Sequence, residues 1–329
     1  MSDRLLVTTF PFGEPDPAPR ELLAHAGIDY EVQPWKRRLT EGELARMAAP
    51  FSVLVAGTEP ITAEVMDGAP RLRLISRVGI GLDSVDLLEA RARGITVAYT
   101  PDAPSPAVAE LTVGLMLDLA RHVTDADRRL RAGAWSRLMG RRLDGATIGV
   151  VGAGRVGGRV LRILRGAFPG ARLLAHDLRV DEQLSEATDV SWVEMDELLS
   201  TCDVVTVHVP LTGLTRRMIG ARELGMMKHD AVLINTARGG IVDESDLASA
   251  LRAGALAAAA VDVFEEEPYI GELRTLSNCL LTCHMGSMTA DCRARMETEA
   301  VAEAIRLLRG EPLHQPVPET EYELRRNSK

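Results

Sequence analysis

The most constraining feature of this chain is a glycine-rich turn near its middle, in the segment GVVGAGRVGGRV at residues 149–160. The apolar run at residues 146–151 is typical of a buried parallel strand, and the residues after the turn have helical periodicity. Gly152, Gly154 and Gly157 have the G-x-G-x-x-G spacing, which gives a tight turn, close backbone approach to a pyrophosphate, and close helix–strand packing. A helix N-terminus adds N–H groups and partial positive charge. The turn therefore predicts a dinucleotide-binding site.

An acidic residue at the end of the next predicted strand indicates which dinucleotide is bound. The strand ARLLAHD covers residues 171–177 and ends with Asp177. This residue lies about twenty positions after the last glycine, where a ribose-binding acid is expected. Its carboxylate would accept hydrogen bonds from ribose hydroxyls and repel a 2′-phosphate, although Arg179 would soften that preference. We therefore expect NAD as the cofactor.

The late position of this turn implies a separate domain ahead of it. Over residues 1–100, short strands alternate with amphipathic helices, which predicts a flavodoxin-like α/β domain. A second strand–helix series, from residue 147 to about residue 285, predicts a doubly wound parallel sheet of the Rossmann type. We expect a substrate domain of residues 1–103 plus 290–329 and an NAD-binding domain of residues 104–289. One long helix is expected over residues 107–133, and the helix over 289–310 should return to the first domain.

Composition excludes several classes of protein. The net charge of −9 is spread along the chain without a basic stripe, which argues against a nucleic-acid partner. No segment approaches the roughly twenty apolar residues of a membrane span, and the apolar run at the start of the chain is too short for a signal peptide. Cys202, Cys279, Cys283 and Cys292 lack C-x-x-C spacing, so we expect no disulfides and a cytoplasmic protein. Cys279, Cys283 and His284 lack a convincing fourth ligand, and we expect no metal.

Three predicted strand ends in the second domain carry residues suited to catalysis. Arg238 follows the strand AVLINTA, Glu267 lies in the acidic run after the strand LAAAAVDVF, and His284 follows the strand NCLLTCH. Arginine binds a carboxylate with two parallel hydrogen bonds, and histidine exchanges a proton near neutral pH. A glutamate bound to the far imidazole nitrogen would fix its tautomer. Since working groups lie beyond the carboxyl ends of such strands, the three residues predict oxidation of a 2-hydroxy acid.

The chain resembles the D-isomer-specific 2-hydroxyacid dehydrogenases, and within them most closely the D-3-phosphoglycerate dehydrogenase branch. The resemblance covers nearly the whole length. Its motifs are RVGIGLDSVD at 77–86, AVAELTVGLMLDLAR at 107–121, GVVGAGRVG at 149–157, HVPLTGLT at 208–215, INTARGGIVDE at 234–244, DVFEEEP at 262–268 and HMGSMT at 284–289. The helix over 107–121 and the following arm, AGAWSRLMGRRL, are similar to the family's dimer interface, so the resemblance implies a homodimer.

The resemblance also implies a role for each matching residue. Arg238 would bind the substrate carboxylate and carbonyl, His284 would be the acid/base, and Glu267 would support His284. Backbone N–H groups of Val78 and Gly79, in the first domain, would receive the substrate carboxylate. The cofactor would be held by Asp262 at the nicotinamide carboxamide, by Arg155 and Val156 over the pyrophosphate, and by Val209, Thr236 and Ala237 along its length.

Some positions depart from the family pattern. Phosphoglycerate enzymes commonly hold the substrate phosphate with an Arg-Ser pair, where this chain has Ala56 and Gly57. We expect the C-terminal regulatory domain that many of them carry to be absent. The basic cluster Lys36–Arg38 is either a substitute phosphate site or, more commonly for such runs, a solvated loop. Cys283 replaces a usual proline before His284, and Ser84 replaces a common asparagine.

These observations predict an NAD-dependent enzyme that interconverts a D-2-hydroxy acid and its 2-keto acid, with 3-phosphoglycerate as one possible substrate. Two domains should enclose this small molecule, and closure should exclude water. Two alternatives stay open, since a fold never settles function alone. One is an NAD(H)-sensing corepressor built on the same fold. The other is a relative that oxidises phosphite, formate or a phosphonate.

Overall fold

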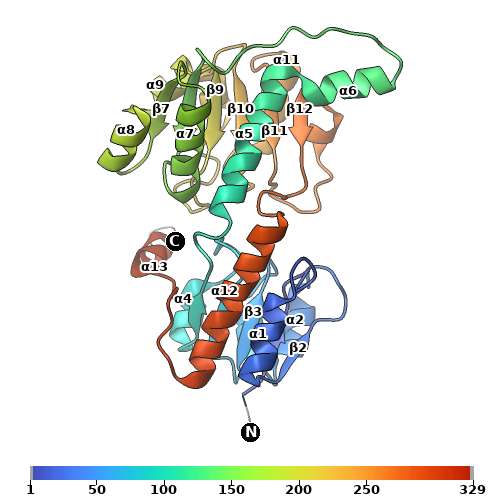
Figure 1. Ribbon diagram of the computed structural model, residues 1–329, viewed down its shortest axis with the longest axis vertical. Helices are drawn as coiled ribbons and strands as arrows, with labels where there is room; N and C mark the ends of the chain where they lie inside the picture. Colours follow the sequence, from blue (N-terminus) through green and yellow to red (C-terminus); the bar gives the residue numbers. More distant parts are fainter. Residues whose placement is uncertain (1–2, 327–329) are drawn as a thin grey trace. The chain divides into compact units, whose positions relative to one another are not determined.

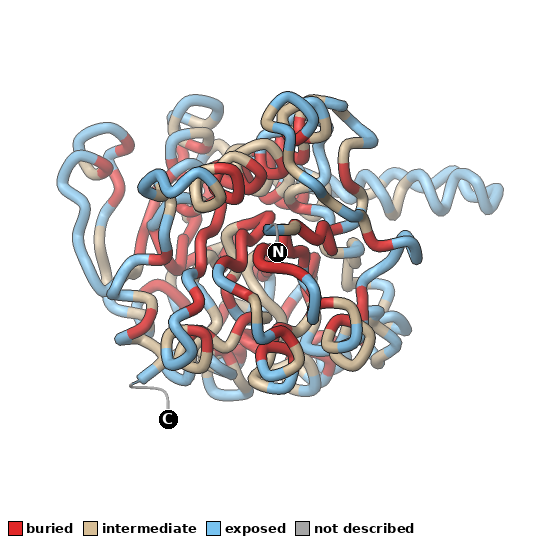
Figure 2. Tube along the Cα trace, turned by 90° about the horizontal axis from the view of Figure 1, so that it is seen from below, coloured by how far each residue is buried: buried red, intermediate tan, exposed pale blue. Residues whose placement is uncertain are grey.

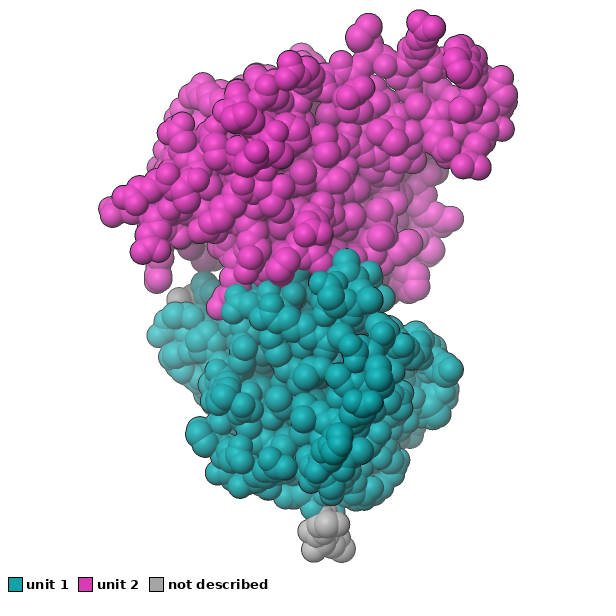
Figure 3. Space-filling view, viewed as in Figure 1, with its two compact units in different colours: residues 1–104, 287–329 teal, residues 105–286 magenta. Residues whose placement is uncertain are grey.

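The computed structural model describes residues 3–326 of the 329-residue chain. Contacts divide the chain into two compact units, coloured separately in Figure 3. Unit 1 consists of residues 1–104 and 287–329, and unit 2 of residues 105–286. The expected boundaries, after residues 103 and 289, lie one and three residues away. Unit 2 is therefore inserted as one continuous segment into unit 1.

Unit 1 contains a five-stranded parallel sheet in the order β2-β1-β3-β4-β5. This is the flavodoxin-like order, which confirms the predicted fold of the first domain. The central strands are buried on both faces, as a sheet covered by helices on both sides requires. Its strands are β1 (Leu5–Val7), β2 (Tyr30–Val32), β3 (Val53–Ala56), β4 (Leu74–Arg77) and β5 (Thr96–Ala98).

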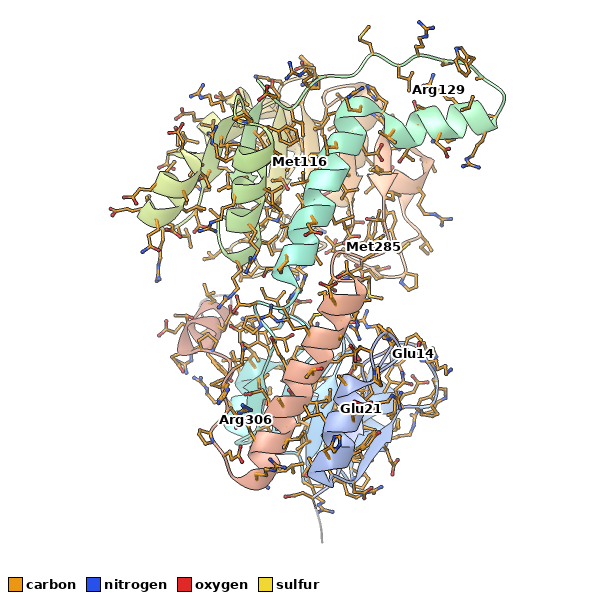
Figure 4. All side chains as sticks on the ribbon, viewed as in Figure 1. Glu14, Glu21, Met116, Arg129, Met285 and Arg306 are labelled. Carbon is orange, nitrogen blue, oxygen red and sulfur yellow. The ribbon has the colours of Figure 1, made fainter. Side chains whose placement is uncertain are left out.

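Helices cover both faces of this sheet (Figure 1). One face carries α1 (Ala18–Ala26) and α12 (Ala290–Arg309), which pack on each other, and α12 also contacts β3 and β4. The other face carries α2 (Glu41–Ala48), α3 (Ala63–Asp67), α4 (Leu87–Ala92) and α13 (Glu319–Arg326). The expected return of the last long helix to the first domain is therefore confirmed. Figure 4 labels Glu21 on α1 and Arg306 on α12.

Unit 2 contains a seven-stranded parallel sheet in the order β12-β11-β10-β9-β6-β7-β8. Counted within the unit, this is the Rossmann order with one further strand at the edge, as predicted. The strands are β6 (Thr147–Val151), β7 (Arg172–His176), β8 (Ser191–Trp192), β9 (Val204–Val207), β10 (Val232–Asn235), β11 (Ala258–Val261) and β12 (Cys279–Leu281). Their carboxyl ends form one edge, on which the glycine turn and the predicted catalytic residues all lie.

Two apolar clusters cover the faces of this second sheet. On one face, α5 (Ser105–Arg121), α7 (Arg155–Ala167) and α8 (Glu182–Thr188) pack around residues such as Met116, labelled in Figure 4. On the other lie α9 (Met195–Thr201), α10 (Ala221–Met226), α11 (Glu244–Ala253) and the 3₁₀ helix η1 (Glu272–Thr275). Within the described residues, no helix is both long and apolar enough to cross a bilayer.

The single helix expected over residues 107–133 is wrong. The structure has two helices, α5 and α6 (Val123–Arg131), and between them His122 has a φ of +56°, in the left-handed region. Asp118 holds the break, because its carboxylate accepts hydrogen bonds from the Thr124 N–H, at 2.7 Å, and the Thr124 hydroxyl. Helix α6 has no buried residue and projects from the body of unit 2 (Figures 1 and 2).

Candidate active site

The glycine turn joins β6 to α7 and leaves the start of the helix open. Gly152 has a φ of +89°, and a Cβ there would lie 2.8 Å from the backbone carbonyl carbon of His208. A Cβ on Gly157 would lie 1.9 Å from the Gly152 carbonyl oxygen, so both positions require glycine. Around Gly154 no atom lies within 4 Å of the Cβ position, and no side chain caps α7. This open N-terminus fits the pyrophosphate of a dinucleotide.

Asp177 follows β7 at the predicted ribose position. Its Oδ2 accepts a hydrogen bond from the Ala153 N–H at 2.8 Å, and its Oδ1 accepts one from the Arg179 N–H at 3.3 Å. The carboxylate therefore also fixes the glycine turn. Since a carboxylate has about four acceptor sites, capacity remains for ribose hydroxyls. Val209 lies against Gly152, and Val156 is half-buried in the first turn of α7.

A buried imidazole lies beside the glycine turn. His208 follows β9, and its Nε2 hydrogen-bonds with the Thr206 hydroxyl at 3.0 Å. The side chain as a whole is half-buried, but its Nδ1 is out of contact with solvent and has no hydrogen-bond partner among the described residues. Burial lowers the pKa of His208 to about 3, so the ring is neutral at physiological pH.

The predicted catalytic residues follow three neighbouring strands. In the sheet, β10 pairs with β11 and β11 pairs with β12, all parallel. Arg238, Glu267 and His284 come after these strands in that order, so they share one edge of unit 2.

Glu267 binds the imidazole of His284 directly. The Nδ1 atom of His284 lies 3.0 Å from Oε1 and 2.9 Å from Oε2 of Glu267. Oε1 also accepts a hydrogen bond from the Phe264 N–H at 3.1 Å, which orients the carboxylate. An N–H at Nδ1 donates to the carboxylate, so Nε2 is the atom that can exchange a proton with a substrate. Both side chains are about one-third exposed, at 34% and 28%.

Arg238 lies on a turn that is tied to the Glu267 loop. The Asn235 side chain accepts from the Ala237 N–H at 3.1 Å and donates to the Arg238 carbonyl at 3.0 Å, which closes the turn. A Cβ on Gly239 would lie 1.9 Å from the backbone carbonyl carbon of Phe264. The two backbones therefore touch, and this contact places Arg238 beside the loop of Glu267.

The Glu267 loop has a second support from α11. The carboxylate of Glu244, the first residue of this helix, accepts a hydrogen bond from the Glu265 N–H at 2.7 Å. Burial raises the pKa of Glu244. The Arg238 turn and α11 thus both support the loop that positions Glu267.

Asp262 organises the loop that carries His284. Its carboxylate accepts hydrogen bonds from the Thr282 hydroxyl (2.6 Å) and from the N–H groups of Met285 (2.9 Å) and Gly286 (3.0 Å). Figure 4 labels Met285 in this loop. The His284 N–H donates to the Asp262 carbonyl at 2.7 Å, and His284 has a φ of +50°. Asp262 is 1% exposed, and its binding to a nicotinamide carboxamide stays a prediction.

Sequence reasoning missed several positioning residues. Asn235 hydrogen-bonds the Arg238 backbone, Gly239 contacts Phe264 in the Glu267 loop, and Thr282 hydrogen-bonds Asp262. Only Asn235 carries a local sequence signal, since asparagine after a strand often closes a turn. The hydroxyl of Thr236, predicted to lie along the cofactor, is 2.8 Å from the hydroxyl of Thr112 on α5. Thr112 was missed as well, because this contact joins residues 124 positions apart.

The cysteines show no metal site or disulfide. All four are free thiols, and burial raises the pKa of Cys279 to about 12. Among residues 3–326, no three His, Cys, Asp or Glu side chains are grouped closely enough to hold a metal ion.

Val78 and Gly79 follow β4 in unit 1. The Val78 N–H donates to the Ala56 carbonyl at 2.8 Å, and the Gly79 N–H donates to the Thr100 hydroxyl at 2.8 Å. A substrate carboxylate at this turn must share or replace these acceptors. The guanidinium of the buried Arg77 lies beside Gly79, 3.0 Å from its Cβ position, and supplies positive charge there.

The Rossmann sheet with its open glycine turn, and the Arg–Glu–His group at the same edge, define a dinucleotide-dependent oxidoreductase. Residues 113–286 match the family described as D-isomer specific 2-hydroxyacid dehydrogenase, NAD binding domain. The chain belongs to this family, as predicted.

Named relatives agree with this membership. The chain is 36% identical over 295 residues to the hydroxypyruvate reductase of Thermotoga maritima, covering 87% of this chain and 94% of that protein. It is 40% identical over 279 residues to the D-3-phosphoglycerate dehydrogenase of Methanocaldococcus jannaschii, covering 83% of this chain but only 53% of that protein. The D-lactate dehydrogenase of Aquifex aeolicus, solved with NAD and lactic acid, superposes with a TM-score of 0.83 at 26% identity, covering 96% and 99% of the two chains.

Proposed function

We propose that this protein is an NAD-dependent D-2-hydroxyacid dehydrogenase that interconverts a small D-2-hydroxy acid and its 2-keto acid. The observation that carries the proposal is the Glu267–His284 pair, held at 2.9 Å on the edge that also carries the Arg238 turn and the glycine turn. A bound imidazole with one proton-exchanging nitrogen, beside an arginine, is what alcohol oxidation next to a carboxylate requires.

Each residue has one task in this proposal. Arg238 binds the carboxylate and the carbonyl oxygen of the keto acid. Val78 and Gly79 are the substrate-binding residues that the resemblance implies for unit 1. In oxidation, Nε2 of His284 takes the hydroxyl proton while Glu267 holds Nδ1; in reduction the proton returns. Bound NAD would supply the hydride acceptor for the alcohol carbon. The glycine turn, Val156, Val209 and Asp177 would hold it, with Arg155, Thr236, Ala237 and Asp262 as further contacts.

Kinetics on the whole protein test this proposal. We expect NADH oxidation with at least one of glyoxylate, hydroxypyruvate, 3-phosphohydroxypyruvate or phosphonopyruvate. Arg238→Ala should abolish turnover and leave NADH affinity nearly intact, whereas Arg222→Ala, on the exposed surface of α10, should behave as wild type. Tight NADH binding without turnover of any acid would instead favour the sensor alternative.

A second variant tests the acid/base role. His284→Gln should remove the proton exchange and flatten the pH–rate profile. Turnover that keeps its pH dependence in this variant would contradict the assignment.

We further propose that the protein acts as a cytoplasmic homodimer. The arm formed by α6 and residues 132–143 exposes Val123 (59%), Leu130 (55%), Trp135 (82%) and Met139 (93%). A cavity of about 290 Å³ lies at its base, lined by residues including Leu119, Met139 and Val232. Apolar side chains this exposed on a projecting arm favour burial against a second copy.

A further inference from the structure

Three loops of unit 1 meet at the carboxyl ends of β1, β3 and β4, which are neighbours in the sheet. The Thr8 N–H donates to the Val55 carbonyl at 2.9 Å, and the Val78 N–H donates to the Ala56 carbonyl at 2.8 Å. The turn assigned to the substrate carboxylate therefore adjoins the loop of residues 57–60. The charge of that loop therefore bears on what can lie next to the turn.

A buried carboxylate occupies this loop. Glu59 is 1% exposed, and its Oε1 accepts hydrogen bonds from the Thr8 hydroxyl and from the Gly57 N–H, the latter at 2.9 Å. Across residues 3–326, no lysine, arginine or histidine forms an ion pair with Glu59. Its charge is therefore stabilised by hydrogen bonds alone.

The neighbouring cation does not balance Glu59. Arg293, which is 7% exposed, donates from Nη2 to Glu297 at 2.7 Å, to the Pro11 carbonyl at 2.7 Å and, weakly, to the Thr9 hydroxyl at 3.4 Å. The fully buried Glu297 thus neutralises Arg293. Among the described residues, Glu59 therefore has no ion-pair partner at the end of β3, whereas the buried Arg77 stands beside Gly79, after the neighbouring strand β4.

Any side chain at Gly57 would require the Glu59 carboxylate to move. A Cβ on Gly57 would lie 2.7 Å from Oε2 of Glu59 and 3.1 Å from the Cα of Thr9. The carboxylate fills the space that a longer side chain would need. The basic cluster Lys36–Arg38 follows the edge strand β2, separated from β3 by β1, and Arg37 pairs with Glu43 at 2.6 Å.

We propose that Glu59 is a specificity residue that restricts the substrate to 2-hydroxy and 2-keto acids whose side group carries no negative charge. The inference rests on the proposed function and on the placement of the substrate carboxylate at Val78–Gly79. A phosphate held beside Glu59 would bring like charges together in a poorly solvated place, where they repel strongly. A hydroxyl would instead donate to the carboxylate. Hydroxypyruvate and glyoxylate meet this condition, and 3-phosphohydroxypyruvate does not.

The test compares kcat/KM for these three acids with NADH at fixed ionic strength. In the wild type, kcat/KM for hydroxypyruvate should exceed kcat/KM for 3-phosphohydroxypyruvate by at least about 100-fold. Glu59→Gln keeps the shape of the side chain and removes its charge, and it should narrow this ratio by about tenfold or more. Glu64→Gln removes an exposed charge on α3 nearby and should leave the ratio unchanged.

The outcomes separate the two proposals. A wild type that prefers 3-phosphohydroxypyruvate, or a folded Glu59→Gln variant with an unchanged ratio, overturns the role of Glu59 while the dehydrogenase function stands. Failure to reduce any of the three acids, with NADH bound, counts against both. The wild-type comparison tests the inference even if Glu59→Gln does not fold.

Discussion

At the scale of single residues, the site depends on one carboxylate that both orients and charge-balances an imidazole. Glu267 binds Nδ1 of His284 and the Phe264 N–H with the same group. Glu267→Gln keeps the size but removes the counter-charge for the protonated ring, so reduction of the keto acid should slow by at least about tenfold. Stopped-flow and steady-state rates would measure this.

The adjacent acid provides a control for that variant. Glu266 is exposed, and Glu266→Gln should keep the wild-type rate. Equal rates in wild type and Glu267→Gln would show that the pair is not used in proton transfer.

A second residue-scale prediction concerns His208. Its pKa of about 3 lies below the ordinary value of about 6.5, so the folded state binds fewer protons than the unfolded state between these pH values. Stability from this residue is thus complete above about pH 6.5 and falls as pH drops, by up to about 2 kcal/mol at pH 5. NMR titration should find the ring neutral at pH 5. Protonation with a midpoint near 6.5 would contradict this.

At the scale of elements, we expect two glycines at the start of α7 to have different roles: Gly157 in folding, and Gly154 in binding the cofactor. Gly154 has open space around its Cβ position, whereas Gly157 has none. Gly154→Ala should therefore fold with a nearly unchanged Tm but weaken NADH binding by about tenfold, because the methyl group occupies the approach to the pyrophosphate. Isothermal calorimetry measures the affinity.

Another glycine of the same helix is the matched control. Gly166 is exposed near the end of α7 and also has no atom near its Cβ position. Gly166→Ala should bind NADH normally and gain roughly 0.5–1 kcal/mol of stability from helix propensity. Normal NADH affinity in Gly154→Ala would contradict the assignment of the pyrophosphate to this turn.

The helices and strands also show which parts of the structure could be predicted from the sequence. Apolar runs followed by turns predicted the long strands, and the rule that sites lie at strand ends predicted Arg238 and His284. The break at His122 was missed because a left-handed histidine gives no pattern signal, and the contact of Gly239 with Phe264 was missed because it joins separate loops. Short elements such as α8, of seven residues, and β8, of two, were missed, since so few residues show no clear periodicity.

At the scale of the whole molecule, the arm predicts the assembly state. Figure 4 labels Arg129 on the projecting helix α6. Trp135→Ser with Met139→Ser should convert a dimer into a monomer of 35.7 kDa, because both apolar side chains lose their burial in the partner. Light scattering after gel filtration measures the mass.

The control for assembly lies in unit 1. Trp35 is 44% exposed outside the arm, and Trp35→Ser should remain a dimer. A wild type that is monomeric at micromolar concentration would rule out this use of the arm.

The insertion of unit 2 into unit 1 imposes an order on biosynthesis. All of residues 105–286 leave the ribosome before α12, the helix that covers one face of the unit 1 sheet. Unit 2 can therefore complete its hydrophobic core while the chain is still being synthesised, since domains fold as units during synthesis. The other unit must wait, with β3 and β4 uncovered, until residue 309 has been added. A nascent chain stalled before that point exposes an apolar sheet to chaperones.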